Sequence, residues 1–144
     1  MSALHVLFTV GESDLVVPAS DVLHMESFTT VTRVPGAPEH VAGLVQIRHR
    51  VVPVVDLRKR LGLPQQAPTI DSRVLVVKSG ERAVGLLVDK AREVIQLEPD
   101  QFKAPPDVVT SQSAGFVQSV IQIAGRLLML VNLEKLIGEV RHGE

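Results

Sequence analysis

The side chains best suited to holding a metal or moving a proton are five histidines: His5, His24, His40, His49 and His142. A protein metal site needs several converging ligands, often visible as two histidines four residues apart or as closely spaced cysteines. No two histidines here are four residues apart, no carboxylate completes a ligand pattern beside them, and the chain has no cysteine. We therefore expect neither a metal nor a cofactor.

Serine and carboxylate chemistry are equally poorly represented. The sequence Ser113-Ala114-Gly115 lacks the flanking pattern of a nucleophile elbow, and no glycine-rich loop of the phosphate-binding type is present. The carboxylates are scattered and have local roles, with Asp56 as a helix cap and Asp89 at the end of a strand. The sequence therefore predicts that the protein is not an enzyme.

One local excess of positive charge follows the centre of the first half and comprises Arg48, Arg50, Arg58, Lys59 and Arg60. Small barrels that bind single-stranded nucleic acid combine such charge with stacking aromatic rings. This chain has four Phe and no Trp or Tyr, and its net charge is −1. A solvated face or the rim of a protein interface explains the arginines better. Nucleic-acid binding is kept as an alternative that requires affinity falling steeply with salt.

The elements that would position these charges are organised around residues 43–62, GLVQIRHRVVPVVDLRKRLG. Two β-branched apolar runs flank Arg48-His49-Arg50, which predicts two strands joined by a tight turn. Asp56 then offers an N-cap for one helical turn, and Gly62 stands where a left-handed C-terminal residue is favoured.

This unit occurs twice. Residues 119–138, SVIQIAGRLLMLVNLEKLIG, align with residues 43–62 without a gap, and residues 75–87 resemble residues 6–18 in pattern. The chain is therefore a tandem duplication of a small β-rich unit. We expect one domain over residues 1–144, with halves at about 1–63 and 73–138 and a linker at 64–72, and an extensive interface shared by the halves.

Local patterns predict the remaining elements. Strands are expected at residues 4–10, 14–18, 24–34, 44–47, 51–55, 73–78, 82–89, 93–97, 116–123 and 126–131. Helical turns are expected at 19–23, capped by Ser20 or Asp21, at 39–42, and at 133–137, with a long loop at 98–113. Pro53 predicts an edge position or a bulge, because it cannot donate to a strand ladder. The fold class is all-β with short helices, and about five short strands in each half suit a small closed or nearly closed barrel.

Composition favours a folded cytoplasmic protein. Hydrophobic residues make up 45% of the chain and are rich in Val and Leu. No apolar run is long enough for a membrane span, and the N-terminal residues lack the basic region of a signal peptide. We expect no direct membrane insertion.

Residues 31–63, 74–97 and 126–138 resemble the CheW family, the coupling proteins of bacterial chemosensory arrays. The resemblance rests on the Pro-Gly-Ala-Pro turn, the spacing from Gly43 to Arg48, the Pro-Val-Val-Asp-Leu run and the Gly-Leu-Leu-Val-Asp run. It implies two intertwined, five-stranded, SH3-like barrels sharing a core. It also implies a non-catalytic adaptor that joins the cytoplasmic tip of a methyl-accepting chemotaxis receptor to the regulatory domain of a CheA-type histidine kinase, with self-association as a further option and a location at receptor arrays.

Two positions depart from the family pattern. The family usually has Gly after the arginine matched by Arg48, where this chain has His49, and commonly has Glu where this chain has His24. The second repeat keeps its glycine, Gly125. The departures are either neutral or mark a specialised scaffold of a non-flagellar pathway that has lost or altered one interface.

The resemblance also suggests which residues contact partners. Arg48 matches the family arginine and is expected to be a polar anchor. Gly43 is expected to permit close approach at the groove that takes a receptor helix, with a purely structural role as the alternative. The full set of candidate interface residues is Arg48, His49, Gly43, His24, Val34, Pro35, Val41 and Val88. For Val34, Pro35, Val41 and Val88, a role in the hydrophobic core is the alternative.

Overall fold

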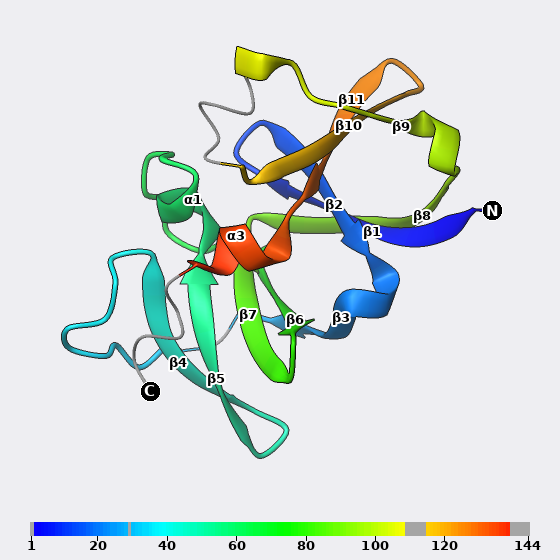
Figure 1. Cartoon of the computed structure of the whole chain (residues 1–144). Helices are drawn as coiled ribbons and strands as arrows, with labels where there is room; N and C mark the ends of the chain where they lie inside the picture. The colour runs from blue at the N-terminus through cyan, green and yellow to red at the C-terminus, as the bar shows by residue number, and fades with distance from the viewer. Residues whose placement is uncertain (1, 29, 109–114, 139–144) are drawn as a thin grey trace.

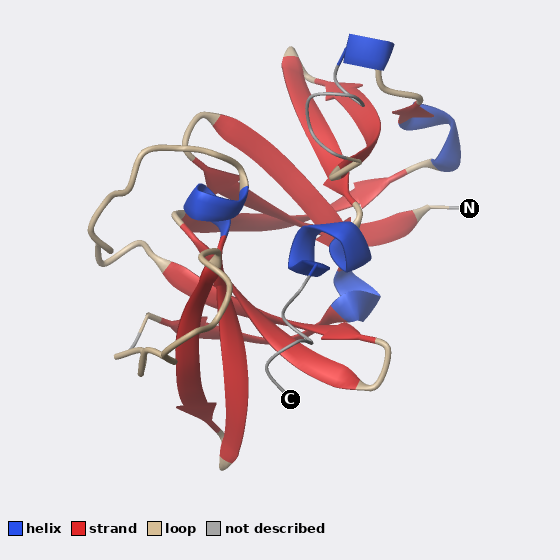
Figure 2. Cartoon of the chain, turned by 60° about the vertical axis from the view of Figure 1, so that its left-hand side comes forward, coloured by secondary structure: helices blue, strands red, loops and turns tan. Residues whose placement is uncertain are grey.

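The computed structural model describes residues 2–28, 30–108 and 115–138. Strands dominate it, as Figures 1 and 2 show, and the helices are single turns. The elements are β1 (Ala3–Val10), β2 (Ser13–Pro18), η1 (Ala19–Asp21), β3 (Val22–Ser27), β4 (Val41–Ile47), β5 (Arg50–Asp56), α1 (Leu57–Arg60), β6 (Arg73–Ser79), β7 (Arg82–Val88), β8 (Lys90–Leu97), η2 (Pro99–Gln101), β9 (Phe102–Lys103), β10 (Val117–Ile123), β11 (Arg126–Val131) and α3 (Leu133–Ile137).

The strands form two sheets, and each sheet takes strands from both sequence halves. One has the order β8-β1-β2-β11-β10-β9 and the other β3-β6-β7-β5-β4. The second curls until Thr32, downstream of β3, bridges Leu44 in β4 at its other edge. We call the two units the six-stranded and the five-stranded barrel. The all-β, intertwined architecture expected from the sequence is confirmed, and the sixth strand of the larger sheet is the two-residue β9.

The internal repeat governs strand pairing down to the register. Parallel pairing joins Val54 to Gly85 in one barrel and Leu130 to Val16 in the other, at the same offsets as the sequence repeat. The bulge between Val41 and Gly43 also has a counterpart, between Val117 and Ser119. The two barrels therefore share one pattern of strand pairing, and each combines a hairpin from the first sequence half with a hairpin from the second.

Three apolar clusters make up the core. One fills the five-stranded barrel and includes Val74 and Val76, and another fills the six-stranded barrel and includes Leu7. The largest lies between the sheets and takes Phe8 and Leu75 from the same strands. Because β1 and β6 bury both faces, they appear in the sequence as continuous apolar runs rather than alternating ones.

Several local predictions were wrong. The strand expected at 24–34 ends at Ser27, and the described residues beyond it form a loop with one bridge at Thr32. The helical turn expected at 39–42 is a non-helical turn that leads into β4. The Thr- and Val-rich composition favoured a strand. The chain instead turns at the Pro-Gly-Ala-Pro segment and extends toward α1.

Pro53 and the first helical turn also differ from expectation. Strand β5 is an internal strand, not an edge, and Pro53 is tolerated because the pairing with β7 begins one residue later, at Val54. The turn at η1 follows Pro18 and has no side-chain cap, so neither Ser20 nor Asp21 caps it. The expected loop at 98–113 contains η2 and β9 within its described part.

Candidate functional site

Two exposed residues of the predicted site, Arg48 and His49, form the tip of the β4–β5 hairpin. Ile47 pairs with Arg50, so the turn consists of Arg48 and His49 alone. Both have positive φ angles, 51° and 67°, as a mirror-image two-residue turn requires. The equivalent turn of the six-stranded barrel uses Ala124 and Gly125, with φ angles of 50° and 76°. The sequence-based concern about His49 is thus justified, because a bulky side chain occupies a backbone conformation that favours glycine.

Arg48 reaches from this tip to the edge strand β3. Its Nε donates to Glu26 Oε2 at 3.1 Å, with side-chain exposures of 64% for Arg48 and 28% for Glu26. His24 lies two residues before Glu26 on the same strand and is half-buried. The sheet covers its side chain in part. The structure therefore brings Arg48 and its neighbour His49 close to Glu26 of β3 and forms one polar surface there.

A second group of predicted residues surrounds an open hollow of about 590 Å³ beside α1. Val34, Pro35 and Val41 all line it, together with Asp56, Lys59 and Gln65. Val34 and Pro35 are exposed, whereas Val41 is half-buried and packs against the largest core cluster. The hollow is lined by the first sequence half and, at Gln65, by the linker that follows it. Asp56, expected only to be a cap, also borders this hollow.

Gly43 does not line the hollow itself, but it supports the loop that forms one wall of the hollow. A Cβ atom there would lie 2.1 Å from the carbonyl oxygen of Thr32, and the φ angle is 150°. The loop that carries Val34 and Pro35 can therefore bridge to β4 only if residue 43 has no side chain. Gly43 thus permits a close approach of the chain's own backbone.

Val88 does not belong to any surface. It is 1% exposed and packs in the core cluster between the sheets. The structure places it in the core, which was the alternative interpretation, because β7 is covered on both faces.

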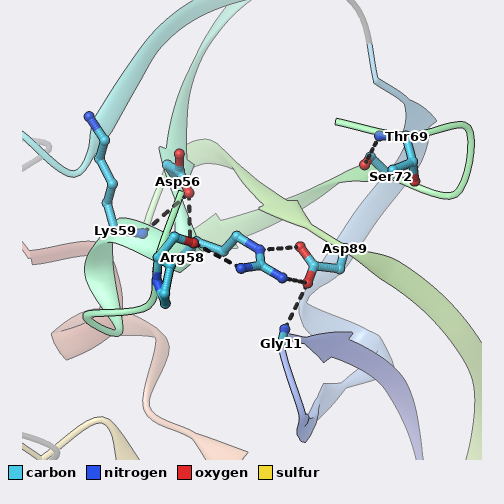
Figure 3. A network of polar contacts seen from close by, with 8 residues as sticks. Gly11, Asp56, Arg58, Lys59, Thr69, Ser72 and Asp89 are labelled. Carbon is cyan, nitrogen blue, oxygen red and sulfur yellow. Dashed lines mark hydrogen bonds and ion pairs between the residues drawn. The ribbon is translucent and has the colours of Figure 1, made fainter. Parts of the chain in front are cut away.

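Sequence reasoning missed a polar cluster that joins the two halves, drawn in Figure 3. Arg58 of α1 donates to both carboxylate oxygens of Asp89, at 3.0 and 2.7 Å, and the backbone N–H of Gly11 donates to Asp89 at 2.7 Å. Arg58 also donates to the carbonyl oxygen of Pro64 at 2.9 Å. Gly11, Arg58 and Asp89 are far apart in sequence. Sequence analysis had counted Arg58 only as part of a basic run.

Asp56 holds α1 in place for this cluster. Its side chain accepts hydrogen bonds from the backbone N–H groups of Arg58 and Lys59, which confirms the predicted N-cap. Burial alone would raise the pKa of Asp89, but hydrogen bonds from Arg58 and Gly11 and the charge of Arg58 outweigh it and lower that pKa. The hydrogen bond to Asp89 raises the pKa of Arg58 in turn.

Arg60 makes a second link between the halves. It donates to the carbonyl oxygens of Leu136 and Lys135 at the end of α3, and its guanidinium lies 4.9 Å from the ring centroid of Phe116. Two arginines of one helical turn thus tie the first half to the second. Both are half-buried, and their guanidinium groups are engaged in contacts within the chain.

Among the described residues, no group of three or more His, Cys, Asp or Glu side chains is arranged to hold a metal ion. Within the same residues, no helix is long and apolar enough to cross a membrane.

Comparison with known proteins decides what kind of domain carries these surfaces. The sequence model described as the CheW-like domain matches residues 4–141. The chain belongs to the CheW-like family. It is 31% identical to the chemotaxis protein CheW of Rhizobium meliloti over 129 residues, which cover 90% of this chain and 83% of that protein. The chemotaxis protein CheW of Bacillus subtilis is 28% identical over 127 residues, covering 88% and 81%.

A solved structure agrees with these sequence matches. The scaffolding protein TtCheW from Thermoanaerobacter tengcongensis superposes with a TM-score of 0.88 at 28% identity, covering 96% of this chain and 94% of that one. These matches confirm the resemblance to the CheW family that the sequence indicated. They also confirm the expected non-catalytic adaptor or scaffold role in chemotaxis.

Proposed function

We propose that this CheW-like protein couples a methyl-accepting chemotaxis receptor to the regulatory domain of a CheA-type histidine kinase. The observation that carries the proposal is the CheW-like match over residues 4–141.

Two surfaces are available for two partners. The first is the polar tip formed by Arg48, His49 and β3, where an exposed guanidinium can anchor a carboxylate of a partner. The second is the hollow lined by Val34, Pro35 and Val41, where apolar side chains sit beside Asp56 and Lys59. A mixed apolar and polar concavity suits the face of an amphipathic helix, such as a receptor tip.

The links between the halves suit a coupler mechanically. Arg58 and Arg60 hold both halves through a single turn of helix that borders the hollow. A partner seated in the hollow would thus contact the element that connects the two barrels. Coupling then requires only that the two partners prefer the same arrangement of the barrels.

A pull-down with the receptor cytoplasmic fragment and the kinase regulatory domain tests the proposal. Wild type should retain both, Arg48→Ala should weaken at least one of them, and His49→Gly should retain both. The matched control is Arg126→Ala, which removes an arginine near the tip of the other hairpin. Failure of the folded wild type to bind either partner would refute the proposal.

A specialised scaffold is the second candidate, favoured by one observation. His49 has a φ angle of 67°, where the other barrel has glycine, so a strained and titratable side chain has been accepted at the tip. Under this alternative wild type binds a single partner, and His49→Gly restores the other.

A further inference from the structure

The residues that precede the two equivalent hairpins occupy matching positions in the repeat. His40 and Phe116 stand three residues before the aligned segments 43–62 and 119–138. The carbonyl oxygen of His40 accepts a hydrogen bond from the backbone N–H of Asp56, the N-cap of α1, at 2.8 Å. That of Phe116 accepts one from Asn132, the N-cap of α3, also at 2.8 Å. Each of the two residues is therefore fixed to the helical turn of its own half.

Both positions also contact the helical turn of the other half. Nε2 of His40 donates to the carbonyl oxygen of Ile137, the last residue of α3, at 3.3 Å. The ring of Phe116 has its centroid 4.9 Å from the guanidinium of Arg60, the last residue of α1. Arg60 donates in addition to the two preceding carbonyl oxygens of α3, at 2.8 and 3.0 Å. The first half thus provides partners for three carbonyl groups at the end of α3, where a helix leaves its carbonyls without an internal partner.

His40 and Arg60 lie directly behind the walls of the hollow. Glu39 and Val41 line it on either side of His40 in the sequence. Lys59 lines it next to Arg60. His40 is itself buried, with 9% of its surface exposed. A molecule seated in the hollow would therefore contact the neighbours of both residues, and a change in the loop or in α1 would reach α3 through them.

The helical turn α3 is anchored in the six-stranded barrel. It follows β11 after a single residue, and its cap is bonded to Phe116, one residue before β10. Leu136 and Ile137 are buried in the largest core cluster, and α3 lies at the junction of the two sheets in both Figure 1 and Figure 2. Because packed interiors transmit strain, a shift of α3 is passed to these strands.

We infer that His40 and Arg60 are positioning residues for coupling, through which a partner in the hollow sets the place of α3 and, with it, of the six-stranded barrel. The inference deepens the proposed function and rests on it for the identity of that partner, a receptor helix. Two parallel links suit the task, because one comes from the loop of the hollow and the other from α1. Gly138 supports the second link, since a Cβ atom there would collide with the guanidinium of Arg60 and glycine suits its φ angle of 59°.

Amide hydrogen exchange at Leu136 reports on these links, because its N–H donates to the carbonyl oxygen of Asn132 within α3 at 2.9 Å. The first measurement needs no partner. Pro35→Gly with Pro38→Gly loosens the loop that lines the hollow. In an otherwise wild-type chain, this change should raise the exchange rate at Leu136 by at least about threefold.

The same loop change is then made in a chain without the two links. Arg60→Met keeps the aliphatic stem and removes the donors, and His40→Phe keeps a ring and removes its donor. In this background the loop change should raise the exchange rate at Leu136 by less than about 1.5-fold. Circular dichroism checks that every variant is folded, and each single link variant, measured in the same way, should show a response between the two.

The second measurement adds the receptor cytoplasmic fragment at a saturating concentration. Wild type should exchange at Leu136 at least about threefold more slowly with the fragment bound, whereas the variant without the two links should bind the fragment with no change in exchange. The matched control is Arg73→Met, since Arg73 also donates to two backbone carbonyl oxygens but within its own segment. It should respond as wild type does. A merely structural role for Arg60 and His40 would raise basal exchange and leave the response intact.

Either measurement can overturn the inference. In the first, the contrary result is a loop change that acts equally in both backgrounds. In the second, it is a bound fragment that leaves Leu136 unchanged in wild type or slows its exchange equally in the variant without the links. The fragment has bound in that case, so the proposed coupling function stands. A fragment that does not bind wild type refutes that function instead, and the first measurement then decides the inference alone.

Discussion

The tips of the two equivalent hairpins show what the duplication has kept and what it has changed. The β4–β5 and β10–β11 turns have nearly the same φ angles, yet one carries Arg48-His49 and the other Ala124-Gly125. The second pair follows the preference of the turn, whereas the first places two large side chains in it. Backbone geometry was thus retained in both copies, while one tip acquired a charged surface at a cost in conformational energy.

The two barrels also differ in the ion pairs that their arginines form. Arg48 is paired with Glu26 across the five-stranded barrel, and Arg58 with Asp89 across the halves. The residues that the repeat places opposite Arg58 and Asp89 are Glu134 and Ser20, which cannot form the same bidentate pair. The five-stranded barrel and α1 therefore carry these two links, whereas the six-stranded barrel has a different ion pair, between Arg126 and Asp14 at 3.2 Å.

The largest difference between the barrels should appear at Gly43 and its counterpart Ser119. Gly43→Ala should destabilise the protein by about 2 to 4 kcal/mol, because the new Cβ would collide with the Thr32 carbonyl oxygen. Ser119→Ala should change stability by less than about 0.5 kcal/mol. Urea denaturation compares the two, and equal losses would mean that the barrels pack this bulge alike.

Breaking the link through α1 should have the next largest effect. Asp89→Asn removes charge-assisted hydrogen bonds from a partly buried guanidinium and should cost about 1 to 2 kcal/mol. The matched change Asp21→Asn, half-buried in η1 and outside this cluster, should be nearly neutral.

The same pair predicts a pH dependence. The pKa of Asp89 is lowered by folding, so its contribution is present above the unfolded pKa of about 3.8 and is lost as pH falls through the lower folded value. Thermal unfolding between about pH 6 and about pH 2.5 should show a shallower acid decline for Asp89→Asn than for wild type. Parallel declines would contradict the assignment.

Exchange of the turn residues addresses the tips directly. His49→Gly should stabilise the protein by about 1 kcal/mol, because glycine adopts a φ angle of 67° without strain, and Gly125→His should destabilise it by a similar amount. Chemical denaturation measures both. A destabilising His49→Gly would indicate that His49 makes a contact that outweighs its backbone cost.

Arg48→Ala should have the smallest effect on stability, below about 0.5 kcal/mol, because the ion pair with Glu26 is largely exposed. Its effect on partner binding should be much larger, whereas Arg126→Ala should leave binding unchanged. Thermal unfolding and the pull-down on the same samples separate the two. A large loss of stability would reassign Arg48 to a structural role.

The sequence was most informative where one strand or turn decides the structure. The repeat, the hairpins, the Asp56 cap and the left-handed Gly62 could all be predicted, because they depend on residues close together in the chain. The loop after β3 could not, since Thr32 meets β4 only through a contact that Gly43 permits. Likewise, Arg58 meets Asp89 across 31 residues, a pairing that no local pattern announces.

Candidate site residues divided in the same way. The sequence located the Arg48-His49 turn because a strand ended on each side of it. It could not separate Val34 and Pro35, which line the hollow, from Val88, which is buried, because an apolar residue in a strand or loop looks the same on either side of a sheet.

Bridging of receptor and kinase tests the central claim most directly. Receptor cytoplasmic fragment would be immobilised and the captured kinase regulatory domain measured with no adaptor, with wild type, and with Arg48→Ala. We predict capture that depends on the wild-type protein and falls with Arg48→Ala. Kinase capture that is the same with and without the folded wild-type protein would contradict the claim that this CheW-like chain is a coupler.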